Sequence, residues 1–405
     1  MEISLRAGMD MSKRILVVIH RLRTGGGAQR VASEVGSRLS KRGHDVSFFT
    51  FYSSESGYDI EGDSFTLKGQ RKFYPLEYSL DIVRSAKEIS KISEREDIET
   101  VVSFLHRCNV SVLLSKILFG NDARIIVSVR NNPRAMDKIT NIQKKYLHPK
   151  ADEIVVQTER IKQIIKQDFS IENVVIIPNP VQLKKIKELA EEEIPSKHKE
   201  IFGNDFVFIN VGGLREQKGQ WHLLRSFKKV TQELENSHLV ILGEGELREE
   251  LKDLRDKLDL DREVSFLGNV DNVFPYLRES DCFVLSSLHE GYPNVILEAL
   301  SQNLPVISTD CVSGPREILS PELSLEEEID YPYFGEYGII TPQLDEEILF
   351  EMMEEEPLSK QEEILSEAMV KVARSEAVEE RYRNGIERLR GLVPERIVDK
   401  WEELL

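Results

Sequence analysis

The sequence predicts an α/β protein that consists of two doubly wound parallel-sheet domains. Continuous apolar runs, typical of strands buried on both faces of a parallel sheet, alternate with helical stretches over residues 13–177. The alternation stops at Pro178-Asn179-Pro180 and a charged stretch over residues 184–199, and it resumes over residues 206–308. Alternation of this kind indicates a parallel sheet with helices on both faces. The 405 residues are enough for two or three domains.

The first half opens with a strand at residues 15–19, a glycine-rich loop and a helix with Val31, Val35 and Leu39 on one face. Gly43 ends this helix, because glycine accepts the left-handed conformation common after a helix. We expect the following strands at residues 46–51, 100–104, 124–129, 153–157 and 174–177.

The second half repeats this pattern and then changes character. Its strands are expected at residues 206–211, 238–242, 264–267, 282–285 and 305–308. From about Leu325 the chain is strongly acidic, and we expect it to be helical and to end in an amphipathic segment. These patterns predict an N-terminal domain of residues 1–182, a C-terminal domain of residues 183–376 and a terminal helix over residues 377–405.

The net charge of −17 argues against a nucleic-acid-binding protein, because such proteins carry basic surfaces. The charge is unevenly distributed. Residues 1–180 hold 28 Lys or Arg against 22 Asp or Glu, whereas residues 181–405 hold 26 against 49. Residues 130–150 alone carry six basic side chains against Asp137. This basic cluster fits either a contact with an anionic membrane surface or a solvated helix face.

Cysteine usage and hydropathy limit the cellular compartments in which the protein is expected. Cys108, Cys282 and Cys311 are far apart and form no C-x-x-C pair, which favours reduced, structural cysteines. The N-terminus lacks the apolar stretch of a secretory signal, and no segment approaches the ~20 apolar residues of a membrane span. We therefore expect a cytoplasmic protein, at most peripheral on the inner face of the cell membrane.

In each half, the first strand is followed by one glycine-rich loop. In the first, Gly25, Gly26 and Gly27 precede a helix, where backbone N–H groups can approach an anion closely. In the second, a glycine pair is followed by Arg215 and Lys218, whose charges oppose the helix dipole unless an anion such as a diphosphate neutralises them. A plain tight turn and a solvated basic turn are the alternatives for the two loops.

The strongest signal is a pair of glutamates, Glu290 and Glu298, with a Gly-x-Pro turn after the first. Glu290 is expected in a loop and Glu298 inside the following helix. A glutamate within a helix usually lies on a solvated face, which is the alternative interpretation of Glu298. The amides between Tyr292 and Val295 would lie at the helix N-terminus. One loop thus offers an anion cradle and two carboxylates that accept from hydroxyls, as a nucleotide sugar requires.

Other candidate motifs indicate no metal. Asp259 and Asp261 end a charged helix and are interpreted as solvated, and His106, His148 and His222 fit no metal-ligand spacing. We expect neither a metal nor a cofactor.

The segment from Glu290 to Glu298 reproduces the E-x7-E motif of family 4 retaining glycosyltransferases, and the chain resembles that family over residues 13–320. The resemblance implies the GT-B fold, two Rossmann-like domains facing across a cleft. It also implies that the N-terminal domain binds the acceptor, the C-terminal domain binds the nucleotide sugar and the terminal helix crosses back to the first domain.

By that resemblance, Glu298 binds the ribose, Glu290 binds a hydroxyl of the donor sugar, and Lys218 with Arg215 holds the diphosphate. Charge on the leaving nucleotide would be stabilised electrostatically. The other implied donor-binding residues are Gly26, Gly27, Gly213, Leu267, Gly268, Gly291, Tyr292, Pro293 and Asn294.

The chain departs from the family at two positions. Gly213 stands where an arginine is usual, and Arg215 is the candidate replacement. Arg130 stands where many members have a histidine, and we expect it near the reacting sugar carbon. The loop that contains Arg130, Asn131 and Pro133 resembles a subset that transfers hexoses and N-acetylhexosamines in cell-surface glycan assembly.

These patterns predict transfer of such a sugar from a UDP- or GDP-linked donor to a lipid-linked or oligosaccharide acceptor, with retention. Three alternatives remain. A nucleotide-sugar epimerase and a glycogen-type phosphorylase share the architecture, although no pyridoxal-phosphate lysine environment is recognisable. A non-catalytic subunit that binds sugar nucleotide is the third.

Overall fold

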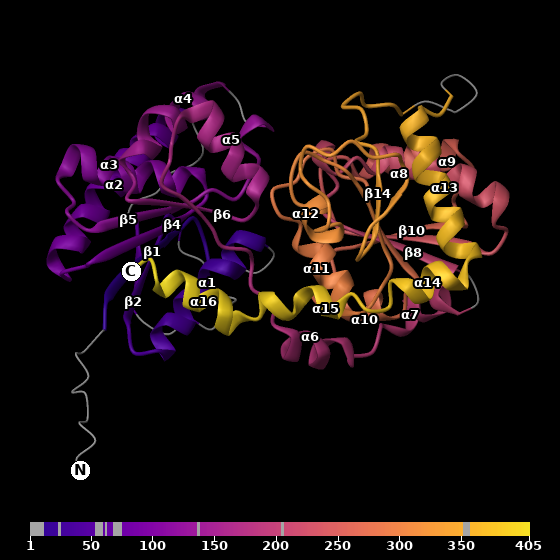
Figure 1. Ribbon diagram of the computed structural model, residues 1–405, viewed down its shortest axis with the longest axis horizontal. Coiled ribbons are helices and arrows are strands. Elements are labelled where there is room, and N and C mark those ends of the chain that lie inside the picture. Colours follow the sequence, from indigo (N-terminus) through magenta and orange to yellow (C-terminus); the bar gives the residue numbers. More distant parts are fainter. Residues whose placement is uncertain are drawn as a thin grey trace, which may run out of the picture. The chain divides into compact units, whose positions relative to one another are not determined.

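The computed structural model describes residues 12–22, 26–52, 60, 63–67, 75–135, 138–203, 206–350 and 357–405. The chain divides into two compact units (Figure 1). The first comprises Met1–Pro180 with Pro394–Leu405, and the second comprises Val181–Val393. Each contains a mainly parallel sheet with helices around it, which confirms the predicted α/β class. Gly25 and Asp137 lie outside the described residues.

The sheet of the first unit has seven parallel strands in the order β3-β2-β1-β4-β5-β6-β7. The β1 run, RILVVI, is buried from its second residue onward, as a strand covered on both faces must be. The strands are β1 (Arg14–Ile19), β2 (Asp45–Thr50), β3 (Ser64–Thr66), β4 (Thr100–Phe104), β5 (Arg124–Ser128), β6 (Glu153–Val156) and β7 (Val174–Ile176).

Helices cover both faces of this sheet. Val31, Val35 and Leu39 of the first helix are buried, as their spacing predicts. That helix packs against the C-terminal helix, and α2 packs against α3; Figure 1 shows these two pairs on opposite sides of the sheet. The helices are α1 (Gly27–Lys41), α2 (Pro75–Arg95), α3 (His106–Phe119), α4 (Lys138–Leu147), α5 (Glu159–Phe169) and the C-terminal α16 (Pro394–Glu402).

The second unit also has a seven-stranded sheet, in the order β10-β9-β8-β11-β12-β14-β13. Its strands are β8 (Phe206–Val211), β9 (Ser237–Leu242), β10 (Val264–Gly268), β11 (Cys282–Leu285), β12 (Val306–Thr309), β13 (Tyr333–Phe334) and β14 (Ile339–Thr341). Its helices are α6 (Leu183–Ala190), α7 (Ser196–Lys199), α8 (Gln220–Glu233), α9 (Arg248–Lys257), α10 (Phe274–Arg278), α11 (Asn294–Ser301), α12 (Pro315–Leu319), α13 (Lys360–Arg374), α14 (Glu376–Arg381) and α15 (Ile386–Leu389).

The expectation of a helical segment from Leu325 onward is wrong for its first part. The strand β14 extends the sheet by pairing in parallel with β12, and β13 pairs antiparallel with β14. The side chains of Ile339 and Ile340 are fully buried, and that burial outweighs the acidic local composition. Helical structure resumes at α13, where Ser359 and Glu362 form a capping box.

The chain returns to the first unit at α16. Its Trp401 is buried and lies 5.5 Å, between ring centroids, from Phe104 of β4. Arg42 forms ion pairs with Asp399 at 2.6 Å and Glu402 at 2.5 Å, and His44 contacts Glu402 at 3.0 Å. Residues 377–393, in contrast, stay with the second unit.

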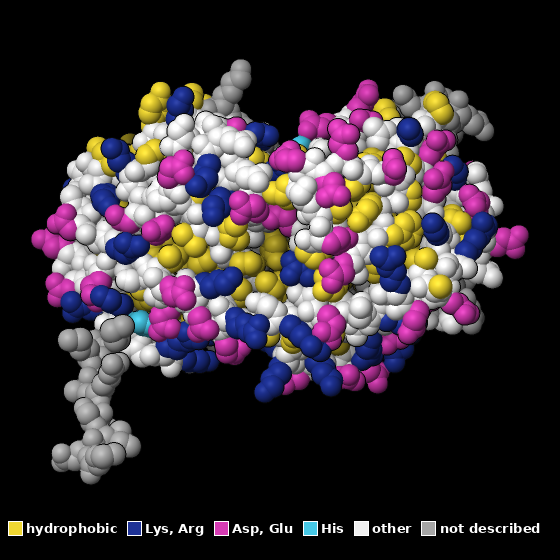
Figure 2. Space-filling model, in the orientation of Figure 1, with side chains coloured by type: hydrophobic (Ala, Val, Ile, Leu, Met, Phe, Trp, Pro, Cys, Tyr) yellow, Lys and Arg dark blue, Asp and Glu magenta, His cyan; other side chains and the backbone are white. Residues whose placement is uncertain are grey.

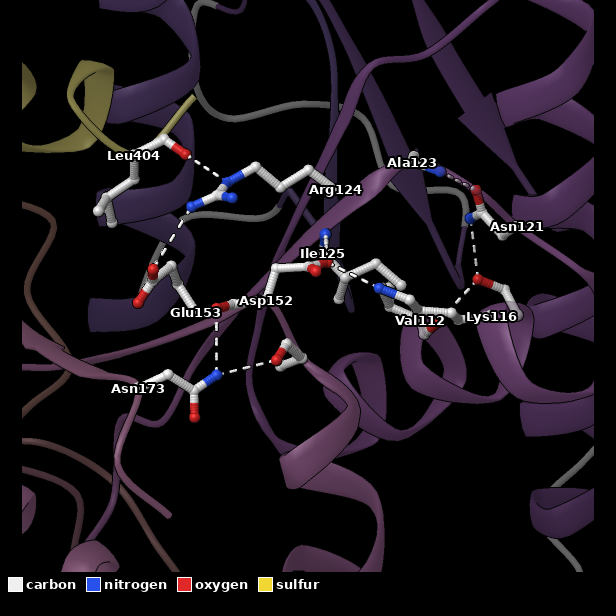
Figure 3. A network of polar contacts seen from close by, with 12 residues as sticks. Val112, Lys116, Asn121, Ala123, Arg124, Ile125, Asp152, Glu153, Asn173 and Leu404 are labelled. Atoms are coloured by element: carbon white, nitrogen blue, oxygen red, sulfur yellow. Dashed lines mark hydrogen bonds and ion pairs between the residues drawn. The ribbon is translucent and has the colours of Figure 1, made fainter.

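A polar network joins the end of the chain to the amino-terminal edge of the first sheet (Figure 3). Arg124 donates through Nε to the carbonyl oxygen of Leu404 at 2.8 Å. Beside it, Asp152 accepts from Nζ of Lys116 at 2.8 Å and from the backbone N–H of Ile125 at 2.7 Å. These contacts lie at the opposite ends of the strands from the loops that follow them.

Both sheets have a point where the strand order reverses. In the first sheet it lies between β1 and β4, and in the second it lies between β8 and β11. Ligands of open α/β sheets bind outside the carboxyl ends of the strands at such points. A ligand is therefore expected to bind at the loops that follow these four strands.

Candidate functional site

The loops after β8 and β11 meet closely in the second unit. Gly219, which ends the β8 loop, has a φ of +57°, and a Cβ added there would lie 2.4 Å from the carbonyl oxygen of Ser286. Ser286 in turn donates through Oγ to the carbonyl oxygen of Lys218 at 2.9 Å. Only glycine permits this approach, because a side chain would both strain the backbone and collide with the β11 loop.

The contact between the loops places Lys218 against Glu290. Nζ of Lys218 lies 2.6 Å from Oε1 of Glu290, and Oγ of Ser287 donates to the same oxygen at 2.8 Å. Glu290 is 8% exposed, so its carboxylate sits largely out of water. A cation and a carboxylate, both predicted from the sequence, are thus held side by side at the switch point.

Further hydrogen bonds hold the backbone of the Glu290 loop. Ser313 donates through Oγ to the carbonyl oxygens of Glu290, at 2.8 Å, and Gly291, at 3.2 Å. Thr309 donates to the carbonyl oxygen of Ser287 at 2.6 Å. Gln217 of the β8 loop donates to the carbonyl oxygen of His289, also at 2.6 Å. The loop is therefore positioned before any ligand arrives, as an electrostatic catalyst requires.

The helix α11 begins where the sequence places it, with Pro293 as N-cap and Asn294 as the first helical residue. The N-terminus of α11, with its positive dipole end, directly follows the loop of Gly291 and Tyr292. Glu298 lies inside the helix and is 8% exposed, so it is no solvated face residue. Burial raises the pKa of Tyr292 to about 12, so its hydroxyl stays protonated at neutral pH.

The side chain of Arg215 lies back over Gly213. A Cβ added at Gly213 would be 3.5 Å from Nε and 3.8 Å from Cδ of Arg215. Part of the Arg215 side chain thus lies next to the space that the Cβ of a residue at position 213 would occupy. The adjacent Gly212 faces Lys218, whose Cε would lie 3.3 Å from an added Cβ.

The turn after β10 borders the same loop region. Gly268 has a φ of +76° and accepts at its carbonyl oxygen from the N–H of Gly243 at 2.9 Å. A Cβ at Gly268 would lie 2.7 Å from Oε1 of Glu244, and one at Gly243 would lie 1.9 Å from the carbonyl oxygen of Gly212. Leu267, beside Gly268, is partly exposed at the carboxyl end of β10.

The first unit holds the remaining predicted residues. Gly26 is the N-cap of α1 and Gly27 its first residue, so both lie at a helix N-terminus as expected. Arg130 follows β5; its Nη2 donates to Oδ1 of Asn179, and its guanidinium lies 5.8 Å from the ring centroid of Phe104. Loss of solvation lowers the pKa of Arg130 to about 9, which leaves it cationic at neutral pH.

A buried cation, Arg107, escaped the sequence analysis. It is the second residue of α3, the helix after β4. Its guanidinium donates to the hydroxyl of Tyr52 at 2.9 Å and lies 3.5 Å from Oδ2 of Asp81. Nearby, burial first and the charges of Arg107 and Arg21 next lower the pKa of His20 to about 4. The position of Arg107 directly after a switch-point strand was the available signal.

A second network missed by the sequence analysis is structural. Oε1 of Glu362 on α13 lies 2.8 Å from Nδ1 of His222 and 2.9 Å from Nε of Arg225, both on α8. All three side chains are buried. Burial raises the pKa of Glu362, but the hydrogen bonds and the adjacent arginine outweigh it and lower the pKa overall. The network joins two helices rather than forming a site.

The basic cluster at residues 130–150 is not a simple solvated face. Lys144 is 3% exposed, and Arg134 pairs with Asp168 at 2.9 Å. The exposed residues of α4 are instead Ile139, Ile142 and Tyr146, together with Lys145. Within the described ranges, no helix has the length and apolar character needed to cross a bilayer.

Two family descriptions match the chain. "Glycosyltransferase Family 4" matches residues 25–185, and "Glycosyl transferases group 1" matches residues 190–324. An uncharacterized glycosyltransferase of Methanocaldococcus jannaschii is 40% identical over 375 residues, which cover 89% of this chain and 92% of that protein. A Campylobacter jejuni transferase that adds N-acetylgalactosamine to a diphospho-undecaprenol-linked sugar is 31% identical, over 60% of this chain and 67% of that protein.

Solved structures share the fold of this chain at low identity. Sucrose-phosphate synthase from Thermosynechococcus elongatus superposes with a TM-score of 0.76 and 16% identity, covering 97% of this chain and 98% of that one. Anabaena HepE in complex with UDP and glucose gives a TM-score of 0.72 and 13% identity, over 96% and 98% of the two chains.

Proposed function

The chain belongs to family 4 of the glycosyltransferases, which have the GT-B fold, and we propose that it transfers a hexosyl or N-acetylhexosaminyl residue to a lipid-linked glycan. The donor in this proposal is a UDP- or GDP-linked sugar, and the anomeric configuration is retained. The coarser conclusion, a glycosyltransferase of glycan biosynthesis, follows from the family and from its relatives.

One observation carries the proposal: the ion pair of Lys218 and Glu290, 2.6 Å apart at the switch point of the second sheet. A carboxylate accepts hydrogen bonds from sugar hydroxyls, and an ammonium group stabilises phosphate. In a nucleotide sugar, the bond between a sugar carbon and the diphosphate joins a sugar with hydroxyl groups to phosphate. The pair therefore supports binding of a nucleotide sugar with its sugar–diphosphate bond beside Lys218 and Glu290.

Breaking that bond transfers its electron pair to the diphosphate oxygen. Lys218, with Arg215 lying over Gly213, supplies positive charge where this negative charge develops. Because the loop is already held by hydrogen bonds from Ser287 and Ser313, little reorganisation is needed during the reaction. Charge supplied by side chains in this way supports a reaction that needs neither a metal nor another cofactor.

The rest of the donor fits around this pair. The N–H groups at the start of α11 suit the distal phosphate and the sugar, and Glu298 suits the ribose hydroxyls. Gly268 and Leu267, at the end of β10, suit the nucleobase through backbone contacts. In the first unit, Gly26 and Gly27 lie at the N-terminus of α1, a position that suits an anion, and we assign Arg130 to the acceptor.

A lipid-linked acceptor is supported by the relatives and by α4. The Campylobacter jejuni relative and an Escherichia coli galactosyltransferase are both named for diphospho-undecaprenol-linked substrates. The exposed side of α4 carries Ile139, Ile142 and Tyr146, three and four positions apart, and Figure 2 shows hydrophobic and basic side chains together where α4 lies. Such a face suits peripheral contact with an anionic membrane.

The test is a panel of UDP- and GDP-linked sugars incubated with the purified chain, with and without a prenyl-diphosphate-linked sugar acceptor. We expect one donor to release its nucleotide and to extend the acceptor. Conversion of the donor sugar without acceptor would identify an epimerase, and donor binding without turnover would identify a non-catalytic subunit.

The membrane contact has a separate test. Ile142→Ser should weaken co-sedimentation with liposomes that contain anionic lipid, while Ile348→Ser, which alters an exposed residue of the second unit, should not. Co-sedimentation that does not depend on anionic lipid would contradict the contact.

A further inference from the structure

We propose that a pocket in the first unit, lined by Arg130, Lys144, His106 and His148, binds the phosphate or diphosphate group of the acceptor. The proposal rests on the function proposed above, because it names the chemical group by which the acceptor is held. Neither the family resemblance nor the relatives assign this pocket.

The pocket lies at the carboxyl ends of two neighbouring strands. Leu105 follows β4, Val129 and Arg130 follow β5, and the side away from the sheet is formed by α4 and the turn after it. The pocket opens to solvent, and the empty space around its lining, which includes open solvent, is about 280 Å³. Leu105 has a φ of +76°, which is unfavourable for a branched side chain and typical of functional loops.

The polar lining of the pocket is basic or neutral. Arg130, Lys144, His106 and His148 line it together with two asparagines, and none of the described lining residues is Asp or Glu. Lys144 is 3% exposed, although lysine is among the residues least often buried. A phosphate group that enters the pocket therefore meets basic side chains and no carboxylate of the described lining.

His148 points to the same conclusion independently. Its side chain is 2% exposed, and Nε2 has no hydrogen-bond partner among the described residues. Buried polar atoms in proteins are nearly always paired, so a lone one in a pocket marks a place for a ligand. Burial first, then the charges of Lys144 and His106, lowers the pKa of His148 to about 3. A bound anion would oppose the effect of these positive charges on the pKa of His148.

Other contacts keep the lining in place. Nε2 of His106 lies 2.7 Å from Oε1 of Gln143 on α4. Asn109 donates through Nδ2 to the carbonyl oxygen of Ser128 at 2.9 Å and accepts from Ser103 at 2.8 Å. These bonds join α3, α4 and the ends of β4 and β5. The pocket is therefore a built site and not a gap between mobile side chains.

Phosphate fits the pocket better than a carboxylate does. Donors of the lining come from different elements, and a tetrahedral phosphate has oxygens in several directions, whereas a carboxylate offers two in one plane. The exposed face of α4, with Ile139, Ile142 and Tyr146, lies on the same helix as Lys144. A phosphate that is attached to a lipid can thus reach Lys144 while its lipid stays near that face.

The test measures binding of inorganic diphosphate to the full chain by calorimetry in chloride buffer. The background variant is Lys218→Ala, so that the donor site does not contribute. We expect Lys144→Gln and His148→Gln each to weaken binding at least about tenfold. Lys145→Gln, which removes the same charge from an exposed position of the same helix, should leave the affinity unchanged.

Melting curves establish whether the variants are folded, and hydrogen exchange of the Lys218→Ala protein gives a measurement that needs no pocket variant. Bound diphosphate should protect α4 and the segment after β5. The proposal is overturned if diphosphate does not bind, if protection lies elsewhere, or if Lys145→Gln weakens binding as much as Lys144→Gln does.

Two further ligands distinguish the source of the phosphate: N-acetylglucosamine 1-phosphate in water, and a short-chain prenyl-diphosphate-linked sugar in detergent. Binding of either one that depends on Lys144 supports the proposal, and a preference for malate over both overturns it. Lys144→Gln should also raise KM for the acceptor in the transfer assay, whereas Lys145→Gln should not. If the wild type transfers no sugar from any donor of the panel, the proposed function fails whatever the pocket binds.

Discussion

Nζ of Lys218 and Oε1 of Glu290 lie 2.6 Å apart, although the two residues are separated by 72 positions in the chain. Each comes from a loop that follows a strand on one side of the switch point between β8 and β11. Gly219 and Ser286 bring those loops together, and Ser287 donates to the same carboxylate oxygen as Lys218. The pair is therefore a property of the sheet topology as much as of the two residues.

The role of Glu298 is tested by Glu298→Gln. This change keeps the size of the side chain and removes the charge that strengthens hydrogen bonds from the ribose. Hydrogen bonds to charged groups contribute about 1.5–3 kcal/mol, so KM for the donor should rise by about tenfold to a hundredfold. The matched control is Glu380→Gln on the exposed side of α14, which should have wild-type kinetics. Unchanged donor KM in Glu298→Gln would remove this residue from the site.

The replacement of the family arginine by Arg215 is tested by moving the arginine. Arg215→Ala should lower kcat, because charge at the diphosphate is lost. Gly213→Arg in the same chain should restore much of it, since a Cβ at position 213 meets its neighbours only at ordinary contact distances of 3.5 Å and 3.6 Å. Full activity in Arg215→Ala alone would show that Arg215 has no part in catalysis.

The reaction should be insensitive to chelators. In the proposed function, Lys218 and Arg215 supply the charge that a divalent cation supplies in other enzymes of phosphate-linked substrates. Assays after treatment with EDTA should therefore give the rate of the untreated protein. Loss of activity with EDTA and its recovery with Mn²⁺ would show that these side chains do not replace a metal.

His148 should make the stability of the first unit depend on pH. Its pKa in the folded chain is about 3, below the 6.5 of the unfolded chain, so folding opposes its protonation. The stabilising effect of the neutral ring is complete above pH 6.5 and is lost as the pH falls from 6.5 toward 3, by up to about 1.4 kcal/mol per pH unit. In phosphate-free buffer, His148→Gln should flatten the fall in melting temperature between pH 6.5 and 4.5. An equal fall in both proteins would contradict the burial argument.

Most of the fold was predictable because its strands carry a strong local signal. The bounds of β4, β8 and β11 agree with their apolar runs, since a strand buried on both faces needs such a run. The strand β14 was missed because three residues in acidic surroundings carry little pattern. Its place is decided by parallel pairing with β12, in which Ser308 is the register partner of Ile340 and Thr309 that of Thr341.

The positions of the candidate site residues in the fold were easier to predict than their contacts. The glutamates were found from their spacing around a turn, yet nothing local indicates that Lys218 reaches Glu290. The charges of α4 were interpreted as a surface, whereas the helix turns Lys144 inward and exposes Ile139 and Tyr146. The orientation of a helix depends on its tertiary neighbours. For α4 these include His106, which begins α3, and His148, which lies in the turn after α4.

The most direct test of the central claim is the rate of sugar transfer by Lys218→Ala, measured at saturating donor and acceptor with a folded protein. If Lys218 stabilises the leaving diphosphate next to Glu290, kcat should fall by about 10²–10³, the usual effect of removing one preorganised stabilising group. Gln217→Ala removes the hydrogen bond to the carbonyl oxygen of His289 and keeps the charge of Lys218, so it shows how much of the effect comes from disturbance of the loop. A kcat for Lys218→Ala equal to that of the wild type would contradict the account.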